Sequence, residues 1–218
     1  LSDHFNAKLV LDQQLHDYRH YISSKSYGFG ENEFTIMWDL IVNSMPKTFS
    51  FVEIGIHRGA ILALIDLLAT REGKYAHRYG ISPMNGAGLG FDQDFTQDVV
   101  DLHNDFDLNH NYEIIKGYST DPEIIDKAKL FSPFDIIYID GSHEYNDVIS
   151  DIVNYTPMIK VGGLLVIDDC NNNRPFAYWG RFWGIQEVAD ATDIIMSLNG
   201  DFEYIGSIIH NTLWRKIK

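Results

Sequence analysis

Three acidic residues stand at the ends of two apolar runs, where they could hold a metal ion. Asp140 follows the run 134–139, and Asp168 and Asp169 follow the run 161–167. Such runs of apolar and β-branched residues are typical of strands buried on both faces of a parallel sheet. If the strands are neighbours, about 4.8 Å apart, the carboxylates meet at one point and repel one another unless they share a cation or a proton. Oxygen ligands favour Mg²⁺ or a similar divalent cation.

These acids and the residues next to them have more than one possible role. Asp168 and Asp169 could instead provide a helix N-cap and a surface charge, and Asn171 could add a side-chain oxygen to a metal site. His143 is the candidate general base, because a neutral imidazole titrates in the useful range, and Asp140 is the alternative. A single histidine after a strand is also often structural.

The segment 48–59 reads as a strand that enters a glycine turn before a helical run at 60–70. Glycines there allow a sharp turn and bring backbone N–H groups towards a ligand. The spacing is Glu53-x-Gly55-x-x-x-Gly59, without the glycine that lets the backbone approach a pyrophosphate in dinucleotide sites. We therefore expect a nucleoside ligand without phosphates. Alternatively, Glu53 caps the following helix.

Further strands and helices alternate along the chain. Strands are expected at 76–82 and 112–119, and two closing strands at 202–209 and 211–217 form a hairpin. Helices are expected at 3–23, 31–43, 60–70, 91–108, from 121 onwards, before 159 and at 184–198. This order predicts an α/β protein with one domain, in which 1–46 is an N-terminal helical cap and 47–218 is the core.

Composition narrows the possible partners and surroundings. The chain has 218 residues, a formal charge of −14 and a pI near 4.8, which disfavours nucleic acid and anionic lipid surfaces. Cys170 is the single cysteine, so no intrachain disulfide forms and a reducing compartment is compatible. The apolar segment 60–69 is too short to span a bilayer and contains Asp66. We expect a soluble, cytoplasmic protein. The start at Leu1 is consistent with excision from a longer polypeptide or with a missing start.

The loop 172–183 is rich in aromatic residues and arginines and is the candidate acceptor site. Aromatic faces stack on sugars or planar molecules, while arginine donates hydrogen bonds. The candidate residues are Tyr178, Trp179, Arg181 and Trp183, with Arg174 as an alternative donor. Core packing or a contact in a homo-oligomer explains such clusters equally well.

Val52-Glu-Ile-Gly55 with Gly59 resembles the first motif of class I S-adenosylmethionine-dependent methyltransferases. The runs Asp140-Gly-Ser-His-Glu-Tyr145 and Gly162-Gly-Leu-Leu-Val-Ile-Asp-Asp169 resemble those of metal-dependent macrocin-type and cephalosporin-hydroxylase-like sugar O-methyltransferases. The resemblance covers about residues 48–170. It implies a Rossmann-like fold with a mostly parallel seven-stranded sheet and a C-terminal antiparallel hairpin.

The resemblance also implies roles for individual residues. Glu53 and Gly55 would lie along the methionine and ribose portions of S-adenosylmethionine, and Tyr118 and Ser119 beside its adenine. The remaining residues implied at the cofactor are His57, Gly59, Ser82 and Asp140. Ser82 stands where the family usually has an acidic residue for the ribose hydroxyls, so Asp92 or Asp94 is an alternative partner. For Tyr118 and Ser119, a plain strand-to-helix turn is the competing interpretation.

The expected function is transfer of a methyl group to a sugar hydroxyl held by Mg²⁺ or a similar cation, on a glycan or another small molecule. The carboxylate spacing does not distinguish a sugar diol from a catechol. Other classes also fit: a metal-independent methyltransferase that uses His143 alone, a non-catalytic nucleoside-binding module, or an NAD-dependent oxidoreductase. A homo-oligomer or a fusion to other domains is compatible with the sequence.

Overall fold

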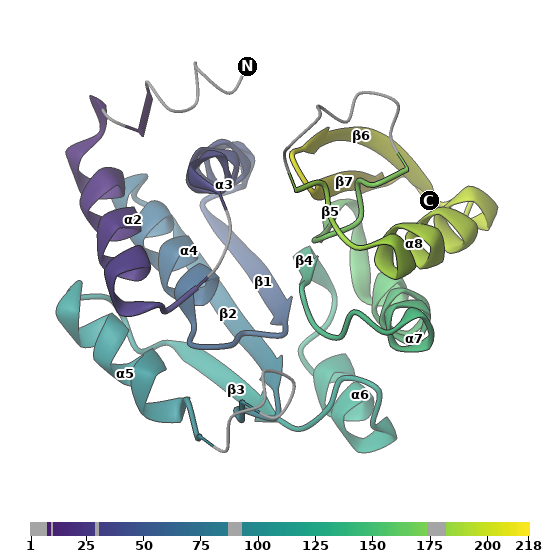
Figure 1. The fold of residues 1–218 in the computed structure, drawn as a ribbon, viewed down its shortest axis with the longest axis horizontal. Coiled ribbons are helices and arrows are strands. Elements are labelled where there is room, and N and C mark those ends of the chain that lie inside the picture. The colour runs from purple at the N-terminus through teal and green to yellow at the C-terminus, as the bar shows by residue number, and fades with distance from the viewer. Residues whose placement is uncertain (1–7, 10, 29–30, 87–92, 174–181) are drawn as a thin grey trace. The chain divides into compact units, whose positions relative to one another are not determined.

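The computed structural model describes residues 8–9, 11–28, 31–86, 93–173 and 182–218 (Figure 1). The chain forms two compact units. The first contains Leu1–Phe49, Ile56–Arg78 and Met84–Tyr112, and the second contains Ser50–Gly55, Tyr79–Pro83 and Glu113–Lys218. The expectation of a single domain stays a prediction.

A seven-stranded sheet has the order β3-β2-β1-β4-β5-β7-β6. Its strands are β1 (Thr48–Ile54), β2 (Tyr75–Ser82), β3 (Tyr112–Lys116), β4 (Phe134–Ile139), β5 (Ile159–Ile167), β6 (Phe202–Ile208) and β7 (Asn211–Lys216). Strands β1 and β4 are parallel, as are β4 and β5, whereas β7 is antiparallel to both β5 and β6. The predicted sheet with a C-terminal antiparallel hairpin is therefore confirmed.

Some boundaries differ from those expected. Within the expected helix 3–23, residues 8, 9 and 11 are helical, but Asp12 interrupts the helix: its backbone is extended, and its side chain accepts the Leu15 amide at 3.2 Å as the N-cap of α2 (Gln13–Lys25). The third strand stops at Lys116, before a glycine with a φ of 157°. The last helix, α8, begins at Gln186 instead of 184.

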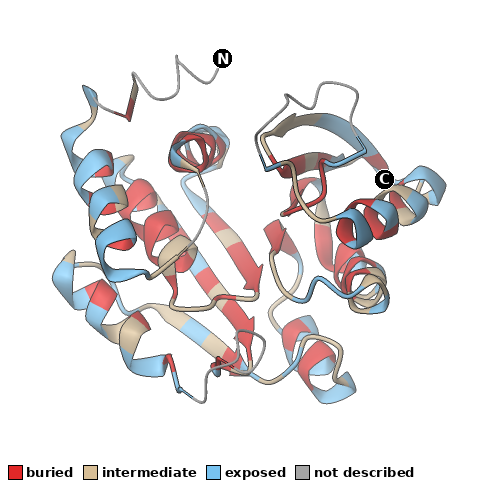
Figure 2. Ribbon diagram, in the orientation of Figure 1, coloured by how far each residue is buried: buried red, intermediate tan, exposed pale blue. Residues whose placement is uncertain are grey.

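The core of the second unit lies on one face of the sheet. Alternate strand residues point to this face, because successive side chains in a strand point to opposite sides. They pack with helices α6 (Pro122–Lys129), α7 (Tyr145–Tyr155) and α8 (Gln186–Leu198). The strand residues in this core include Val52, Ile54, Ile137, Ile139, Leu165 and Ile167. Figure 2 shows that most residues of β1 and β4 are buried.

The first unit consists mainly of α2, α3 (Asn32–Ser44), α4 (Ala60–Arg71) and α5 (Thr96–Asp105). At its centre Arg78 is fully buried, and its guanidinium pairs with Asp66 at 3.1 Å and donates to the Leu62 carbonyl at 3.0 Å. Among the residues that the structure describes, no helix is both long and apolar enough to cross a membrane.

Candidate active site

The register of the central strands brings the predicted acidic residues to one edge of the sheet. Ile54 pairs with Ile139, which pairs with Ile167. The Asp140 amide then donates to the Ile54 carbonyl, and the Asp168 amide to the Ile139 carbonyl, both at 2.9 Å. Asp140 and Asp168 therefore emerge side by side from neighbouring parallel strands.

The surroundings of Asp140 favour its protonated form. The Tyr138 hydroxyl donates to Asp140 Oδ2 at 3.1 Å, and the Asp140 and Asp168 side chains share a hydrogen bond. Loss of hydration raises the pKa of Asp140 well above its ordinary value, and the charges of Asp168 and Glu53 raise it further. A shared proton thus relieves part of the repulsion that the sequence predicts.

His210 lies between the other two acids. Its Nδ1 is 2.8 Å from Asp168 Oδ1 and 2.9 Å from Asp169 Oδ1. Burial alone would lower the pKa of His210, but both carboxylates outweigh it and raise the pKa to about 9. Although desolvation opposes it, the hydrogen bond and charge of His210 lower the pKa of Asp168. The imidazolium of His210 thus offsets part of the negative charge of Asp168 and Asp169.

Sequence reasoning missed His210. This residue lies in the turn between β6 and β7, and β7 is antiparallel to β5, with Thr212 opposite Ile167. The turn therefore reaches the edge of the sheet where β5 ends. The sequence does predict the β6–β7 hairpin. Which residue of the hairpin meets the acids depends on which of its two strands pairs with β5.

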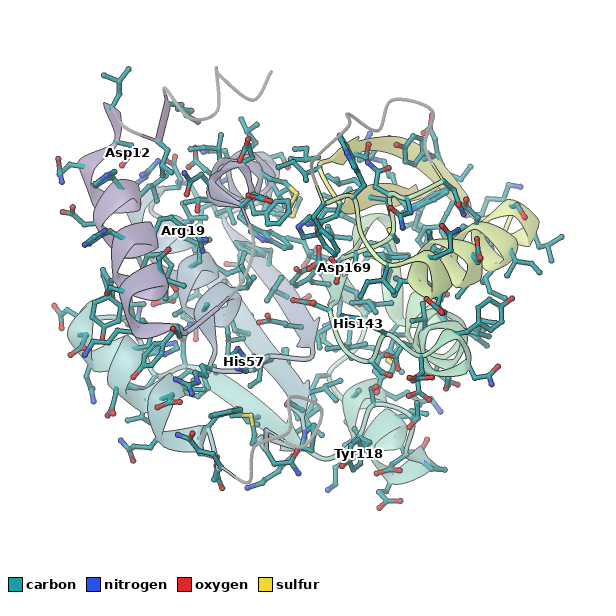
Figure 3. All side chains as sticks on the ribbon, viewed as in Figure 1. Asp12, Arg19, His57, Tyr118, His143 and Asp169 are labelled. Carbon is teal, nitrogen blue, oxygen red and sulfur yellow. The ribbon has the colours of Figure 1, made fainter. Side chains whose placement is uncertain are left out.

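His143 lies on the outer side of the acidic pair. Its Nε2 is 3.3 Å from Asp169 Oδ2, and half of its side chain is exposed. The positions of His143 and Asp169 on the ribbon can be followed in Figure 3. A crevice of about 10 Å³ adjoins them, lined by Ile139, Asp140, Gly141, Ser142, His143, Val148, Ile167, Asp168, Asp169 and Val188. A cavity of this size has room for about one water molecule or ion.

Residues expected at the cofactor also lie in the second unit. Glu53 is buried, pairs in register with Tyr138 and acts electrostatically on Asp140. Gly55 has a φ of 90°, and a Cβ there would lie 1.9 Å from the Asp140 carbonyl oxygen, so only glycine fits. The structure thus brings Glu53 and Gly55 close to the acidic edge, the edge of the sheet that carries Asp140, Asp168 and Asp169.

Three further residues expected at the cofactor occupy the ends of β2 and β3. Ser82 is buried, and its carbonyl accepts the Gly117 amide at 3.1 Å. Tyr118 is exposed, while the Ser119 carbonyl accepts the Tyr155 hydroxyl at 3.0 Å. The end of β2 thus contacts the residue that follows β3, while Tyr118 and Ser119 lie in the turn between β3 and α6.

His57 and Gly59 belong to the first unit. His57 has a φ of 44° and lies edge-on to Phe95, with ring centroids 5.0 Å apart. Burial, and then the charge of Arg58, lower the pKa of His57 to about 4, so its imidazole is neutral. Gly59 is the N-cap residue of α4.

The alternative capping roles are not observed. The N-cap of α4 is Gly59 and that of α8 is Ile185, and neither helix has a side-chain capping hydrogen bond. Glu53, Asp168 and Asp169 therefore cap neither helix. Asp94 Oδ1 accepts the Thr96 amide at 2.8 Å, whereas Asp92 lies outside the described residues.

Only part of the expected acceptor loop is described. Arg174, Tyr178, Trp179 and Arg181 lie outside the described residues. Trp183 is partly exposed, and its carbonyl accepts the Asn171 amide at 3.1 Å. The Ile185 amide donates to the Asp169 carbonyl at 2.8 Å, so this end of the loop is attached to the acidic edge.

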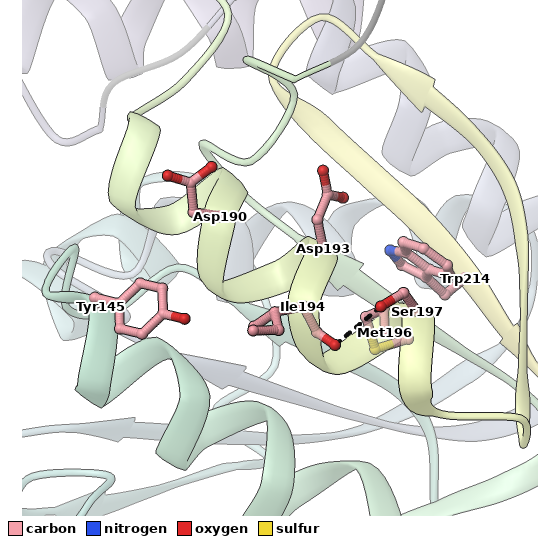
Figure 4. Close-up of a pocket in the computed structure, with 7 residues that line it drawn as sticks. All are labelled: Tyr145, Asp190, Asp193, Ile194, Met196, Ser197 and Trp214. Carbon is pink, nitrogen blue, oxygen red and sulfur yellow. Dashed lines mark hydrogen bonds between the residues drawn. The ribbon is translucent and has the colours of Figure 1, made fainter.

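A wider open groove of about 650 Å³ follows α8 (Figure 4). Its lining residues are Tyr145, Asp190, Asp193, Ile194, Met196, Ser197 and Trp214. None of the acids or histidines of the acidic edge is among them. The smaller crevice is lined instead by Asp140, His143, Asp168 and Asp169.

Comparisons with known proteins relate this chain to methyltransferases. The pattern of a family described as a methyltransferase domain matches residues 52–170. Uncharacterized protein R132 of Acanthamoeba polyphaga mimivirus is 28% identical over 186 residues, which are 79% of this chain and 76% of that protein. Mycinamicin VI 2''-O-methyltransferase of Micromonospora griseorubida is 38% identical over 85 residues, which are 38% of this chain and 20% of that protein.

Solved structures share the fold. A putative caffeoyl-CoA O-methyltransferase from Staphylococcus aureus superimposes with a TM-score of 0.70 at 12% identity, covering 98% of this chain and 96% of that chain. The MycE methyltransferase in complex with Mg, SAH and mycinamycin VI superimposes with a TM-score of 0.60 at 22% identity, covering 89% of this chain and 53% of that chain. The match over more than half of the sequence shows that this chain belongs to the methyltransferase-domain family, as a class I S-adenosylmethionine-dependent methyltransferase that resembles the macrocin-type enzymes.

Proposed function

We propose that this methyltransferase transfers a methyl group from S-adenosylmethionine to a sugar hydroxyl and that it requires a divalent cation. The observation that carries the proposal is the meeting of Asp140, Asp168 and Asp169 at one edge of the sheet, beside the Glu53–Gly55 turn. The partial match to an enzyme named as a 2''-O-methyltransferase supports oxygen as the methyl acceptor. A structural neighbour with bound Mg and SAH supports a cation next to the cofactor.

The donor atoms at the acidic edge fit a divalent cation. Asp168 and Asp169 offer carboxylate oxygens, Asp140 adjoins them, and the crevice has room for one ion. When bound, such a cation would lower the pKa of an acceptor hydroxyl and hold it for transfer. Mg²⁺ is the candidate that follows from oxygen ligands alone.

The protein's own residues would orient the reactants and remove a proton. Glu53 and the Gly55 turn would hold the methionine and ribose portions of the cofactor. His143, half exposed and oriented by Asp169 through Nε2, would accept the proton of the attacking hydroxyl at Nδ1. The bond between the sulfonium and its methyl carbon breaks as the methyl–oxygen bond forms, leaving S-adenosylhomocysteine and a methyl ether.

A metal-independent methyltransferase is the second candidate, and His210 is the observation that favours it. The imidazolium of His210 already supplies positive charge between Asp168 and Asp169. In that case His143 alone would deprotonate the acceptor, and removal of metal would leave the rate unchanged.

Incubation with methyl-labelled S-adenosylmethionine and a panel of glycosides and catechols, with and without EDTA, tests the proposal. We expect label in glycosides and its loss with EDTA. Transfer to catechols alone would contradict the sugar acceptor, and transfer unaffected by EDTA would identify the second candidate. No transfer to any hydroxyl would contradict the proposed function.

A further inference from the structure

We propose that His210 is itself a ligand of the cation, together with Asp168 and Asp169, and that this site therefore prefers a first-row transition-metal dication such as Mn²⁺ to Mg²⁺. The inference rests on the cation site proposed above and specifies its chemistry. Imidazole nitrogen suits Zn, Cu, Fe and Ni, whereas Mg²⁺ favours sites made of oxygen atoms and keeps much of its water shell; Mn²⁺, a transition metal that also suits carboxylates, is the test ion for this mixed site.

The spacing of the three donor atoms fits a shared ion. His210 Nδ1 lies 2.8 Å and 2.9 Å from one oxygen of each aspartate, and the three ligand atoms all lie within 4.8 Å of one another. Two ligands at right angles around a cation, with bonds of about 2.1 Å, are about 3 Å apart. The observed separations also suit neighbouring ligands of one ion, which would replace the proton that His210 Nδ1 shares with the two carboxylates.

The backbone holds His210 in this position. The Cys170 amide donates to the His210 carbonyl at 2.9 Å, and Asn171 Nδ2 donates to the carbonyl of Ile209. Ile209 has a φ of 53°, a left-handed conformation that is unfavourable for a β-branched residue. Such strain persists only where the surroundings enforce it, and it often occurs at functional sites.

Neighbouring side chains add to this arrangement. The Phe182 ring packs edge-on against the His210 imidazole, with centroids 5.1 Å apart. Asp140 hydrogen-bonds to Asp168 and to Tyr138, so its role is to orient Asp168. The ligand set then consists of two carboxylates and one imidazole, in place of the three carboxylates expected from the sequence.

Metal titration by calorimetry, without cofactor or acceptor, tests the inference directly. The variants are His210→Gln, Asp169→Asn and, as a matched control on an exposed helix position, His20→Gln. We expect wild type to bind Mn²⁺ at least about tenfold more tightly than Mg²⁺. His210→Gln should lose about tenfold or more of the Mn²⁺ affinity while Mg²⁺ affinity changes less than about twofold, and Asp169→Asn should weaken both.

A spectroscopic measurement gives an independent result if a variant fails to fold. Electron spin-echo spectra of Mn²⁺ bound to the wild-type protein should show coupling to a ¹⁴N nucleus, and His210→Gln should remove it. Circular dichroism establishes whether each variant is folded.

Four results would overturn the inference: equal affinity for the two metals, no metal binding, no ¹⁴N coupling, or metal binding that His210→Gln leaves unchanged or strengthens. The last would mean that His210 occupies the place of the cation. Methyl transfer is assayed separately. Metal-dependent transfer without Mn²⁺ preference would refute only this inference, whereas His210-dependent Mn²⁺ binding without transfer would refute only the proposed reaction.

Discussion

Nδ1 of His210 lies 2.8 Å from Oδ1 of Asp168, so a residue from the closing hairpin reaches an acid at the end of β5. Asp168 in turn hydrogen-bonds to Asp140 at the end of β4. The acidic edge is thus one connected network in which a proton and an imidazolium offset part of the negative charge. Changes to its members should therefore affect activity more than isolated surface changes would.

Removal of a carboxylate from this network should abolish turnover. We expect Asp168→Ala to reduce methyl transfer by at least about a hundredfold, because a candidate metal ligand and the partner of both Asp140 and His210 are lost. A radiometric transfer assay measures the rate. Asp126→Asn, an exposed position on α6, is the control and should leave the rate unchanged. An Asp168→Ala enzyme with normal activity would exclude this edge as the reaction centre.

His143 should affect the chemical step more than cofactor binding. We expect His143→Gln to lower kcat by about 10²–10⁴-fold, because a positioned general base typically contributes this much. S-adenosylmethionine affinity, measured by calorimetry, should be unchanged. His20→Gln is the control for loss of an exposed histidine. If kcat falls by less than about tenfold, His143 has a structural role instead.

Gly55 is expected to tolerate no side chain, because a Cβ would lie 1.9 Å from the Asp140 carbonyl oxygen. Gly162 is a matched control, with a φ of 87° against 90° for Gly55 and no atom within 4 Å of the place that a Cβ would take. Both alanine variants have similar backbone strain of about 1–2 kcal/mol. Gly55→Ala should cost more than about 4 kcal/mol or prevent folding, because it adds a steric clash. Equal losses in urea denaturation would contradict this.

Asp151, a buried residue of α7, should make stability depend on pH. Loss of hydration raises the pKa of Asp151 from 3.8 to about 7, although the Ser119 hydroxyl opposes the shift. Between these pH values the folded chain binds more protons than the unfolded chain, so the free energy of unfolding falls as pH rises. The shift of about 3 units corresponds to about 4 kcal/mol, lost fully above pH 7.

The Asp151→Asn variant tests this dependence, because its neutral amide does not titrate. Relative to wild type, the variant should become more stable as pH rises from about 4 to about 8. Urea denaturation at several pH values measures the difference. Asp126→Asn, at an exposed position, should show a nearly constant difference from wild type. A constant difference for Asp151→Asn as well would show that its carboxyl has an ordinary pKa.

Loss of one partner of the buried Arg78–Asp66 ion pair should destabilise the first unit more than loss of both charges. Arg78→Met should cost about 3–5 kcal/mol, because it leaves the Asp66 carboxylate buried without its cation. Adding Asp66→Asn should restore part of the loss. Lys129→Met breaks an exposed ion pair with Asp126 and should cost less than about 1 kcal/mol. Chemical denaturation of the four proteins compares the costs.

Much of the fold could be predicted from local patterns. The run 134–139 and the glycine turn at Gly55 each have a short-range cause, namely burial on both faces of a strand and a backbone that only glycine adopts easily. The amphipathic pattern of 3–23 predicts one continuous helix, whereas the capping hydrogen bond of Asp12 interrupts it between residues 11 and 13. Helix ends depend on such single contacts, which periodicity does not reveal.

The sequence by itself determined the α/β class, the glycine turn and the placement of Asp140, Asp168 and Asp169 at strand ends, because strand periodicity and strand ends are local properties of the chain. Only the tertiary structure decided that His210, 41 residues after Asp169, completes the acidic edge and that Asp140 hydrogen-bonds to Asp168. The reason is that strand order and register depend on packing of the whole sheet. They determine which side chains far apart in the sequence lie close enough to interact electrostatically.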